Sequence, residues 1–165
     1  MVSLVPYRTV TVCRGDNLIT MVWDDLQQKI ANEMRGVYSE TAIDHAMNPR
    51  NIGSIENADG HANLTGPCGD TMEIWLKVCN GIIADASFVT DGCGAAIAAG
   101  SMVTELAKSK TTYEALRISQ RDVREALGGL PKESQHCALL AANTLKNSLK
   151  DYLVTRNEKR KQAYR

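Results

Sequence analysis

The sequence lacks several features that would assign it to a simple class. Its 19 Lys and Arg balance 19 Asp and Glu, so it has no net charge and does not suggest the basic face of a duplex-binding protein. No apolar run approaches the ~18 residues of a membrane span, and no secretory signal is recognisable. An odd count of five cysteines then argues against a complete disulfide framework. In a reducing compartment, cysteines near a histidine more often serve metal binding or catalysis.

The length of 165 residues suits one domain with a sizeable core. We divide the chain into an N-terminal extension over 1–33, a main domain over 34–155 and a basic tail over 156–165. The tail carries five basic residues and one acid, a composition typical of a solvated helix end. The first 15 residues do not form the amphipathic pattern of a mitochondrial presequence, so we expect a cytoplasmic protein.

Hydrophobic spacing predicts a helix in the extension and a small sheet after it. An amphipathic helix over 21–35, ended by Gly36, is indicated by apolar residues at helical spacing: Met21, Val22, Trp23, Leu26, Ile30 and Met34. Alternating residues predict strands near 61–65, 71–78 and 82–90, and Asn80-Gly81 between the last two is a strong hairpin signal. On the third strand we expect one face to hold Ile82, Ala84, Ala86 and Phe88.

Helices are expected both before and after the three strands in the sequence. Ser39 is a predicted N-cap for a helix through Met47. After the sheet, we expect a helix over 94–108, a short one capped by Thr111 or Thr112 and reaching Ile118, and one from Ser119 to Gly128-Gly129. Pro131 opens a long last helix with an apolar stripe: Cys137, Leu140, Ala141, Thr144, Leu145, Leu149 and Tyr152. The fold class is therefore α+β, with a three-stranded antiparallel sheet packed against four to five helices.

Three cysteines lie at element boundaries, where loops can converge on one point. Cys68 and Asp70 precede a strand, Cys93 stands between a strand and a helix, and His136 and Cys137 open the last helix. Neighbouring glycines leave room for a close approach to the backbone, and helix N-termini favour thiolate over thiol. Thiolates select zinc, copper(I) or iron–sulfur species. The Asp70 carboxylate is a harder ligand and should bind such a metal more weakly than a thiolate. Five donors are one more than a tetrahedral metal needs, which suits a site from which the metal is later released.

Plainer interpretations apply to the other reactive residues. Cys13 and Cys79 are expected to be inert, because a lone cysteine usually acts as a small hydrophobe. His45 and His61 are expected at the surface or at a cap, and Asp91 in a turn or cap. A cysteine nucleophile paired with His136 is disfavoured, because adjacent helical residues point about 100° apart.

These residues carry a family likeness. From about Met34 to Tyr152 the chain resembles the iron–sulfur cluster assembly scaffold proteins of the IscU and NifU N-terminal type. The matching segments are Tyr38-Ser39-Glu40, Ile43-Asp44-His45, Asn48-Pro49-Arg50-Asn51-Ile52-Gly53, Gly66-Pro67-Cys68-Gly69-Asp70, Asp91-Gly92-Cys93-Gly94-Ala95-Ala96-Ile97-Ala98, Thr104-Glu105-Leu106 and His136-Cys137.

The resemblance implies a scaffold rather than an enzyme. Cys68, Cys93 and Cys137 would hold a [2Fe–2S] cluster, with Asp70 or His136 as the remaining ligand and Asp70 keeping the cluster labile. A cysteine desulfurase would supply sulfur as a persulfide, with Cys137 as the candidate acceptor. An electron donor such as a ferredoxin would reduce it, and the cluster would pass to apo-proteins.

Some family properties do not carry over, and alternatives stay open. Members usually have Leu-Pro-Pro-x-Lys before His-Cys, read by an Hsp70-type chaperone, whereas this chain has Leu130-Pro131-Lys132-Glu133-Ser134. Chaperone recognition is therefore not predicted. A zinc-bound sulfur acceptor or desulfurase activator in the same fold is the alternative function, and zinc binding to the apo form is compatible with both readings. A homodimer is left open.

Overall fold

The computed structural model describes residues 29, 32–33 and 35–163. The chain divides into two units, Met1–Glu33 and Met34–Arg165. In the first unit, Lys29, Asn32 and Glu33 are helical, while the predicted apolar stripe of helix 21–35 and Cys13 lie outside the described residues. Gly36 lies in a turn just after the helical residue Arg35, as predicted for the helix end. No helix in the described ranges has the length and apolarity needed to cross a membrane.

The second unit contains a three-stranded antiparallel sheet in the order β1-β2-β3. The strands are β1 (Gly60–Thr65), β2 (Thr71–Cys79) and β3 (Ile82–Thr90). Asn80 and Gly81 both have positive φ, 53° and 80°, as the predicted two-residue hairpin turn requires. The inward face of β2 is fully buried at Met72, Ile74 and Leu76. The predicted α+β class with its three-stranded sheet is confirmed.

The predicted face of β3 is wrong at its first residues. The pairing of β2 with β3 shifts between Lys77 and Val78, where Lys77 faces Asp85 and Val78 faces Ile83. One extra residue, Ala84, lies in this β-bulge, and a bulge exchanges the faces of the residues before it. Ile83 is therefore buried with Ala86 and Phe88, whereas Ile82 and Ala84 are exposed.

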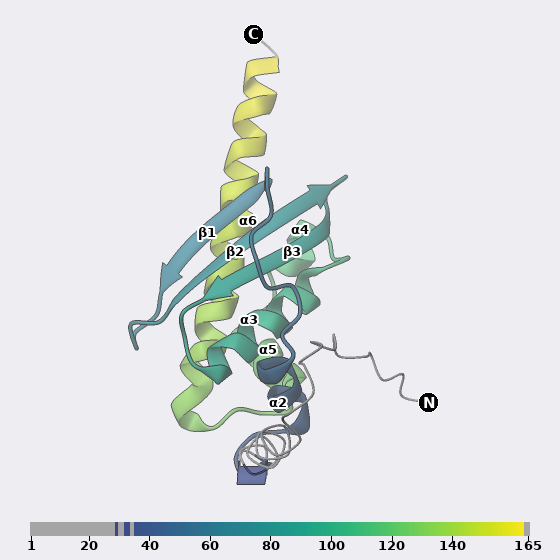
Figure 1. Ribbon diagram of the computed structural model, residues 1–165. Coiled ribbons are helices and arrows are strands. Elements are labelled where there is room, and N and C mark those ends of the chain that lie inside the picture. The colour runs from purple at the N-terminus through teal and green to yellow at the C-terminus, as the bar shows by residue number, and fades with distance from the viewer. Residues whose placement is uncertain (1–28, 30–31, 34, 164–165) are drawn as a thin grey trace, which may run out of the picture. The chain divides into compact units, whose positions relative to one another are not determined.

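Two helices cover one face of the sheet (Figure 1). α3 (Gly94–Ala107) packs on β3, and α6 (Gln135–Ala163) packs on β1 and β2. The backbone of α3 approaches Phe88 so closely that a Cβ on Gly100 would overlap the phenyl ring, which explains a glycine in the middle of a helix. Two further helices pack on this pair: α2 (Glu40–Met47) packs on α3, and α5 (Gln120–Ala126) packs on α6 and α3.

The predicted helix caps are largely confirmed. Ser39 Oγ accepts the Ala42 N–H at 3.0 Å at the start of α2. Thr111 with Glu114, and Ser119 with Asp122, form reciprocal capping boxes. The helix capped by Thr111 is shorter than predicted, because α4 (Thr112–Ala115) ends before Ile118.

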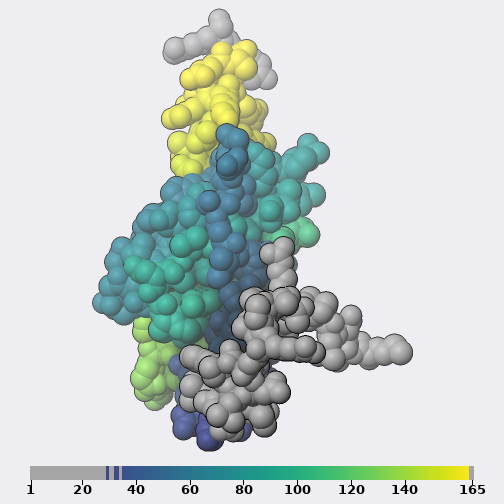
Figure 2. Space-filling model, in the orientation of Figure 1, coloured from purple at the N-terminus to yellow at the C-terminus, as the bar shows by residue number. Residues whose placement is uncertain are grey.

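The last helix is preceded by a 3₁₀ turn and continues for several turns beyond its last buried residue. Pro131 precedes one 3₁₀ turn, η1 (Lys132–Ser134), and α6 follows directly. The predicted stripe is buried from Cys137 to Leu149, Tyr152 is half-buried, and residues 156–163 are exposed. The exposed helix end predicted for the basic tail is thus confirmed as far as Ala163, and it projects beyond the sheet in Figure 2.

Candidate metal centre

Three chain segments meet at one end of the sheet and bring the predicted donors with them. The turn between β1 and β2 is closed by the Gly66 N–H on the Asp70 carbonyl at 2.8 Å, and it carries Cys68 and Asp70. The end of β3 is tied to the start of β2, because the Asp91 carboxylate accepts the Thr71 N–H at 2.6 Å. Asp91 therefore has the turn role that its position predicts, and it orients the segment that ends in Cys93.

All five predicted donors converge. Cys68, Asp70 and His136 form one group whose ligand atoms lie within 4.8 Å of one another, and Asp70, Cys93 and Cys137 form a second. Asp70 belongs to both groups, so its carboxylate is the donor that they share. The convergence predicted from the element boundaries is present, while the role of each residue as a ligand stays a prediction.

The site is graded in exposure. Cys68 and Cys93 are exposed, Asp70 and His136 are half-buried, and Cys137 is only 1 % exposed. A metal held by these donors would therefore contact the buried Cys137 on one side and be accessible to a partner on the side of Cys68 and Cys93. This arrangement suits a cargo that must enter and leave.

Gly92 makes room for the carboxylate. A Cβ at this position would lie 2.9 Å from Asp70 Oδ2 and 2.6 Å from the Ala96 Cβ. Any larger residue would push Asp70 away from Cys93 or displace the first turn of α3. We expect the glycines beside the cysteines to let another group come close to the backbone. At Gly92 this is confirmed, and the group that lies close to the backbone is the Asp70 carboxylate.

The expectation that a helix N-terminus favours the thiolate is wrong for Cys137. Burial, followed by the neighbouring Cys93, Cys68 and Asp70, raises the pKa of the Cys137 thiol from 9.0 to about 12. Removal of the thiolate from water outweighs the helix dipole, and the adjacent anionic groups add to the effect. A bound cation would reverse this balance, so metal loading must release the Cys137 proton.

In the metal-free protein we therefore expect alkylation at pH 8 to discriminate between the cysteines. Cys68, Cys79 and Cys93 are exposed and should react first with iodoacetamide. Cys137 should react much more slowly, because a pKa of about 12 instead of 9.0 lowers the fraction present as thiolate by about a thousandfold relative to an ordinary thiol. Peptide mass mapping over time checks the order, and Cys137 reacting first would contradict this description of the site.

His136 and Cys137 do not point apart as expected for helical neighbours. His136 Nε2 lies 3.5 Å from Cys137 Sγ, and the pair stands in the first turn of α6. This contact does not make a cysteine nucleophile, since an activated thiol needs a lowered pKa and that of Cys137 is raised.

The remaining reactive residues lie outside the site. Cys79 ends β2 at the far end of the hairpin and is exposed. His61 is exposed as expected, stacks on Trp75 with ring centroids 5.0 Å apart, and contacts Glu73. The surface placement predicted for His45 is wrong: it is buried, and its Nδ1 lies 2.8 Å from Ser101 Oγ. Burial lowers the pKa of His45, which favours the neutral ring.

Sequence reasoning missed an apolar cavity of about 140 Å³ next to Cys93. It lies between α2 and α3, and half of its lining residues are alanines: Tyr38, Ala42, Ala46, Cys93, Gly94, Ala95, Ala98 and Leu130. Alanines four apart on α2 and three apart on α3 were the available signal for a close helix contact, but the sequence does not reveal which helices pair.

Comparisons with known proteins agree with this geometry. Residues 37–159 match the family model described as the NifU-like N terminal domain. The chain is 52% identical over 117 residues to iron-sulfur cluster assembly scaffold protein IscU 1 of Archaeoglobus fulgidus, covering 70% of this chain and 76% of that protein. It is 46% identical over 127 residues to the IscU scaffold protein of Escherichia coli K12, covering 74% and 98%.

Solved structures share the fold. The N-terminal part of a NifU-like protein from Brucella abortus matches with a TM-score of 0.58 at 18% identity, covering 72% of this chain and 95% of that one. A putative SUF-system scaffold protein from Fervidobacterium islandicum matches with a TM-score of 0.56 at 23% identity, covering 68% and 96%.

Proposed function

The chain belongs to the NifU-like N-terminal domain family, and from that premise we propose that it is a scaffold for assembling an iron–sulfur cluster and delivering it to apo-proteins. The observation that carries the proposal is the convergence of three thiols with Asp70 and His136 at one partly open site. Thiolates are the ligands on which proteins hold iron–sulfur clusters. The relatives at 52% and 46% identity are named scaffold proteins, and we assign the same non-enzymatic role to this chain.

We propose a [2Fe–2S] cluster held by Cys68, Cys93 and Cys137. The fourth position is taken by Asp70 or His136, which lie in one group with Cys68. Because Asp70 also lies in the group of Cys93 and Cys137, its carboxylate is near all three thiols. A hard carboxylate among soft thiolates gives one weak bond, and that bond is where release can begin.

Sulfur is proposed to come from a cysteine desulfurase as a persulfide, with Cys137 as the acceptor. The terminal sulfur becomes sulfide only after it gains an electron pair, which a donor such as a ferredoxin would supply, and the cysteine thiolate is regenerated. Cys137 is buried, so delivery to it requires the site to open toward the exposed Cys93 or Cys68. Mass spectrometry of the persulfide-bearing peptide identifies the acceptor.

A zinc-bound sulfur acceptor that activates a desulfurase is the second candidate. It is favoured by the donor set itself, because three thiolates and one carboxylate can complete a tetrahedral zinc site.

A homodimer and a cytoplasmic location also stay predictions. Recognition by a chaperone is not predicted, because the segment before His136 departs from the family motif.

Anaerobic reconstitution separates the two candidates. The protein is incubated with ferrous iron, cysteine and a cysteine desulfurase, and visible absorption, iron and acid-labile sulfide are measured. The scaffold proposal predicts a coloured product with equal iron and sulfide, and no colour when the desulfurase is omitted. A colourless product that retains zinc and contains no sulfide would favour the zinc protein instead.

A further inference from the structure

The last turns of α6 are unusual because they have no core to cover. Most helices in proteins are stabilised by burying an apolar face, but residues 156–163 are exposed throughout. In Figures 1 and 2 this end of α6 extends beyond the strands of its own unit. It therefore offers a surface rather than support for the fold.

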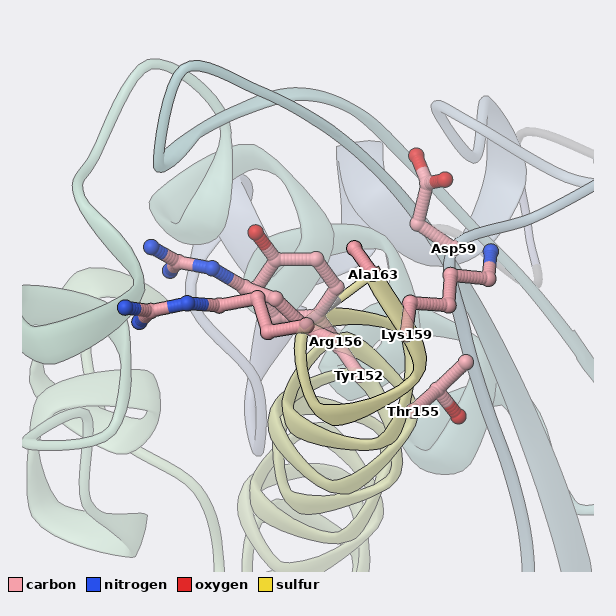
Figure 3. A pocket seen from close by; sticks show the side chains of 7 residues that line it. Asp59, Tyr152, Thr155, Arg156, Lys159 and Ala163 are labelled. Carbon is pink, nitrogen blue, oxygen red and sulfur yellow. The ribbon is translucent and has the colours of Figure 1, made fainter. Parts of the chain in front are cut away.

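Cations gather on this surface around a cavity of about 350 Å³ (Figure 3). The cavity is bordered by one residue before β1 and six residues of α6: Asp59, Tyr152, Thr155, Arg156, Lys159, Arg160 and Ala163. In the view of Figure 3, Lys159 extends on the same side of α6 as Asp59, and Arg156 extends on the other side of the helix. Both cations are among the lining residues of the cavity. We call the six α6 residues the basic helix end.

The positive charges of the basic helix end are not balanced within the unit. Among the described residues, no carboxylate forms an ion pair with Arg156, Lys159 or Arg160. Asp59, the one carboxylate among the lining residues of the cavity, already accepts the Val78 N–H at 2.9 Å and lies 3.5 Å from Lys77 Nζ. Arg156 and Arg160 stand one turn apart, a like-charge spacing that destabilises an isolated helix.

We propose that the basic helix end docks an acidic segment of a partner protein. Two arginines four residues apart are about 6 Å apart along the axis, which matches carboxylates one turn apart on a partner helix. Guanidinium groups bind carboxylates in a bidentate manner, and the Tyr152 ring with the aliphatic stems of the cations supplies an apolar floor.

The charge distribution favours an acidic protein segment over nucleic acid or lipid. The total charge is zero and residues 156–165 carry +5 − 1 = +4, so the rest of the chain carries −4 and would repel an extended phosphate backbone. Asp59 in the wall of the cavity adds to this repulsion. Apart from Tyr152, the lining offers no large apolar side chain to insert between lipids.

The basic helix end and the metal centre occupy opposite parts of α6. Arg156 follows Cys137 by 19 residues, which is about 28 Å along a helix. A partner held here would leave the thiols uncovered. The proposal does not rest on the scaffold function, and metal-free protein suffices to test it.

The test uses a fluorescent helical peptide with glutamates one turn apart and alanines between them, and a matched peptide with glutamine in place of glutamate. Binding to the full chain is followed by anisotropy at low salt. The variant Arg156→Ala/Lys159→Ala/Arg160→Ala is compared with Lys110→Ala/Arg117→Ala/Lys150→Ala, which removes the same charge from exposed positions elsewhere. Alanine favours helix, and circular dichroism checks that α6 persists in both.

We expect the glutamate peptide to bind the natural chain, and roughly tenfold weaker binding to the first variant, as three lost surface ion pairs imply. The control variant should retain the natural affinity, and the glutamine peptide should bind weakly to all three proteins. Equal losses in the two variants, or no binding of the glutamate peptide below roughly 1 mM, would overturn the proposal. Tighter binding of duplex DNA or of phosphatidylserine vesicles than of the peptide would also overturn it and identify another class of partner.

Discussion

A cluster assembled on the Asp70→Ala variant is expected to persist about tenfold longer than one on the natural chain. Single changes around a metal usually alter affinity by this amount or more in the direction of loss, and the opposite sign is expected here because the residue removed is the proposed weak ligand. Asp70 is the residue shared by both donor groups, and it supplies a hard oxygen next to soft sulfurs. Without it, His136 remains within reach of Cys68 and can complete the ligand set with a nitrogen. The decay of visible absorption after a chelator is added measures the lifetime.

Two further variants show whether ligation or charge is responsible. Asp91→Asn removes one negative charge beside the site but keeps an acceptor for the Thr71 N–H, so the cluster lifetime should stay unchanged. Asp70→Ala combined with His136→Ala removes both candidates for the fourth position and should lose the cluster rapidly. A shorter lifetime for Asp70→Ala alone would contradict the proposal that Asp70 is the weak ligand.

Serine at Cys68, Cys93 or Cys137 is expected to abolish most of the iron and sulfide retained after reconstitution. A serine hydroxyl is nearly the size of a thiol but does not ionise near neutral pH and is not a soft ligand. Each of the three thiols belongs to one of the two donor groups, so none is redundant. Iron and sulfide assays on gel-filtered protein give the measurement.

Cys79→Ser is the matched control, because Cys79 is exposed at the other end of the hairpin and should leave the cluster intact. Cys13→Ser is predicted to be silent as well. Since Cys137 is buried in the core, circular dichroism must show that its serine variant is folded, and Cys137→Ala gives an apolar alternative. Retention of full iron and sulfide in any of the three ligand variants would remove that residue from the proposed set.

Local chemistry explains why much of the fold could be predicted. Ser39 at a cap, Asn80-Gly81 in a hairpin and Ser119 with Asp122 in a capping box each depend on contacts within a few residues. The donor set was also predictable, because cysteines at the ends of neighbouring elements are carried to one edge of a sheet.

Features that depend on tertiary packing could not be predicted in this way. The bulge at Ala84 is specified by pairing with β2, and alternation alone gives the wrong face for Ile82. The burial of His45 depends on Ser101, 56 residues away. The raised pKa of Cys137 depends on how much of the core closes over it, which no spacing rule supplies.

The central claim is that this site both holds a cluster and gives it up. The most direct test is transfer of a reconstituted cluster to an apo-ferredoxin in the presence of an iron chelator, followed by the spectrum and activity of the recipient. The account predicts that the recipient gains its cluster while the chelator captures little iron, and that transfer from Asp70→Ala is slower. Iron appearing in the chelator without a functional recipient, or equal transfer from both proteins, would contradict it.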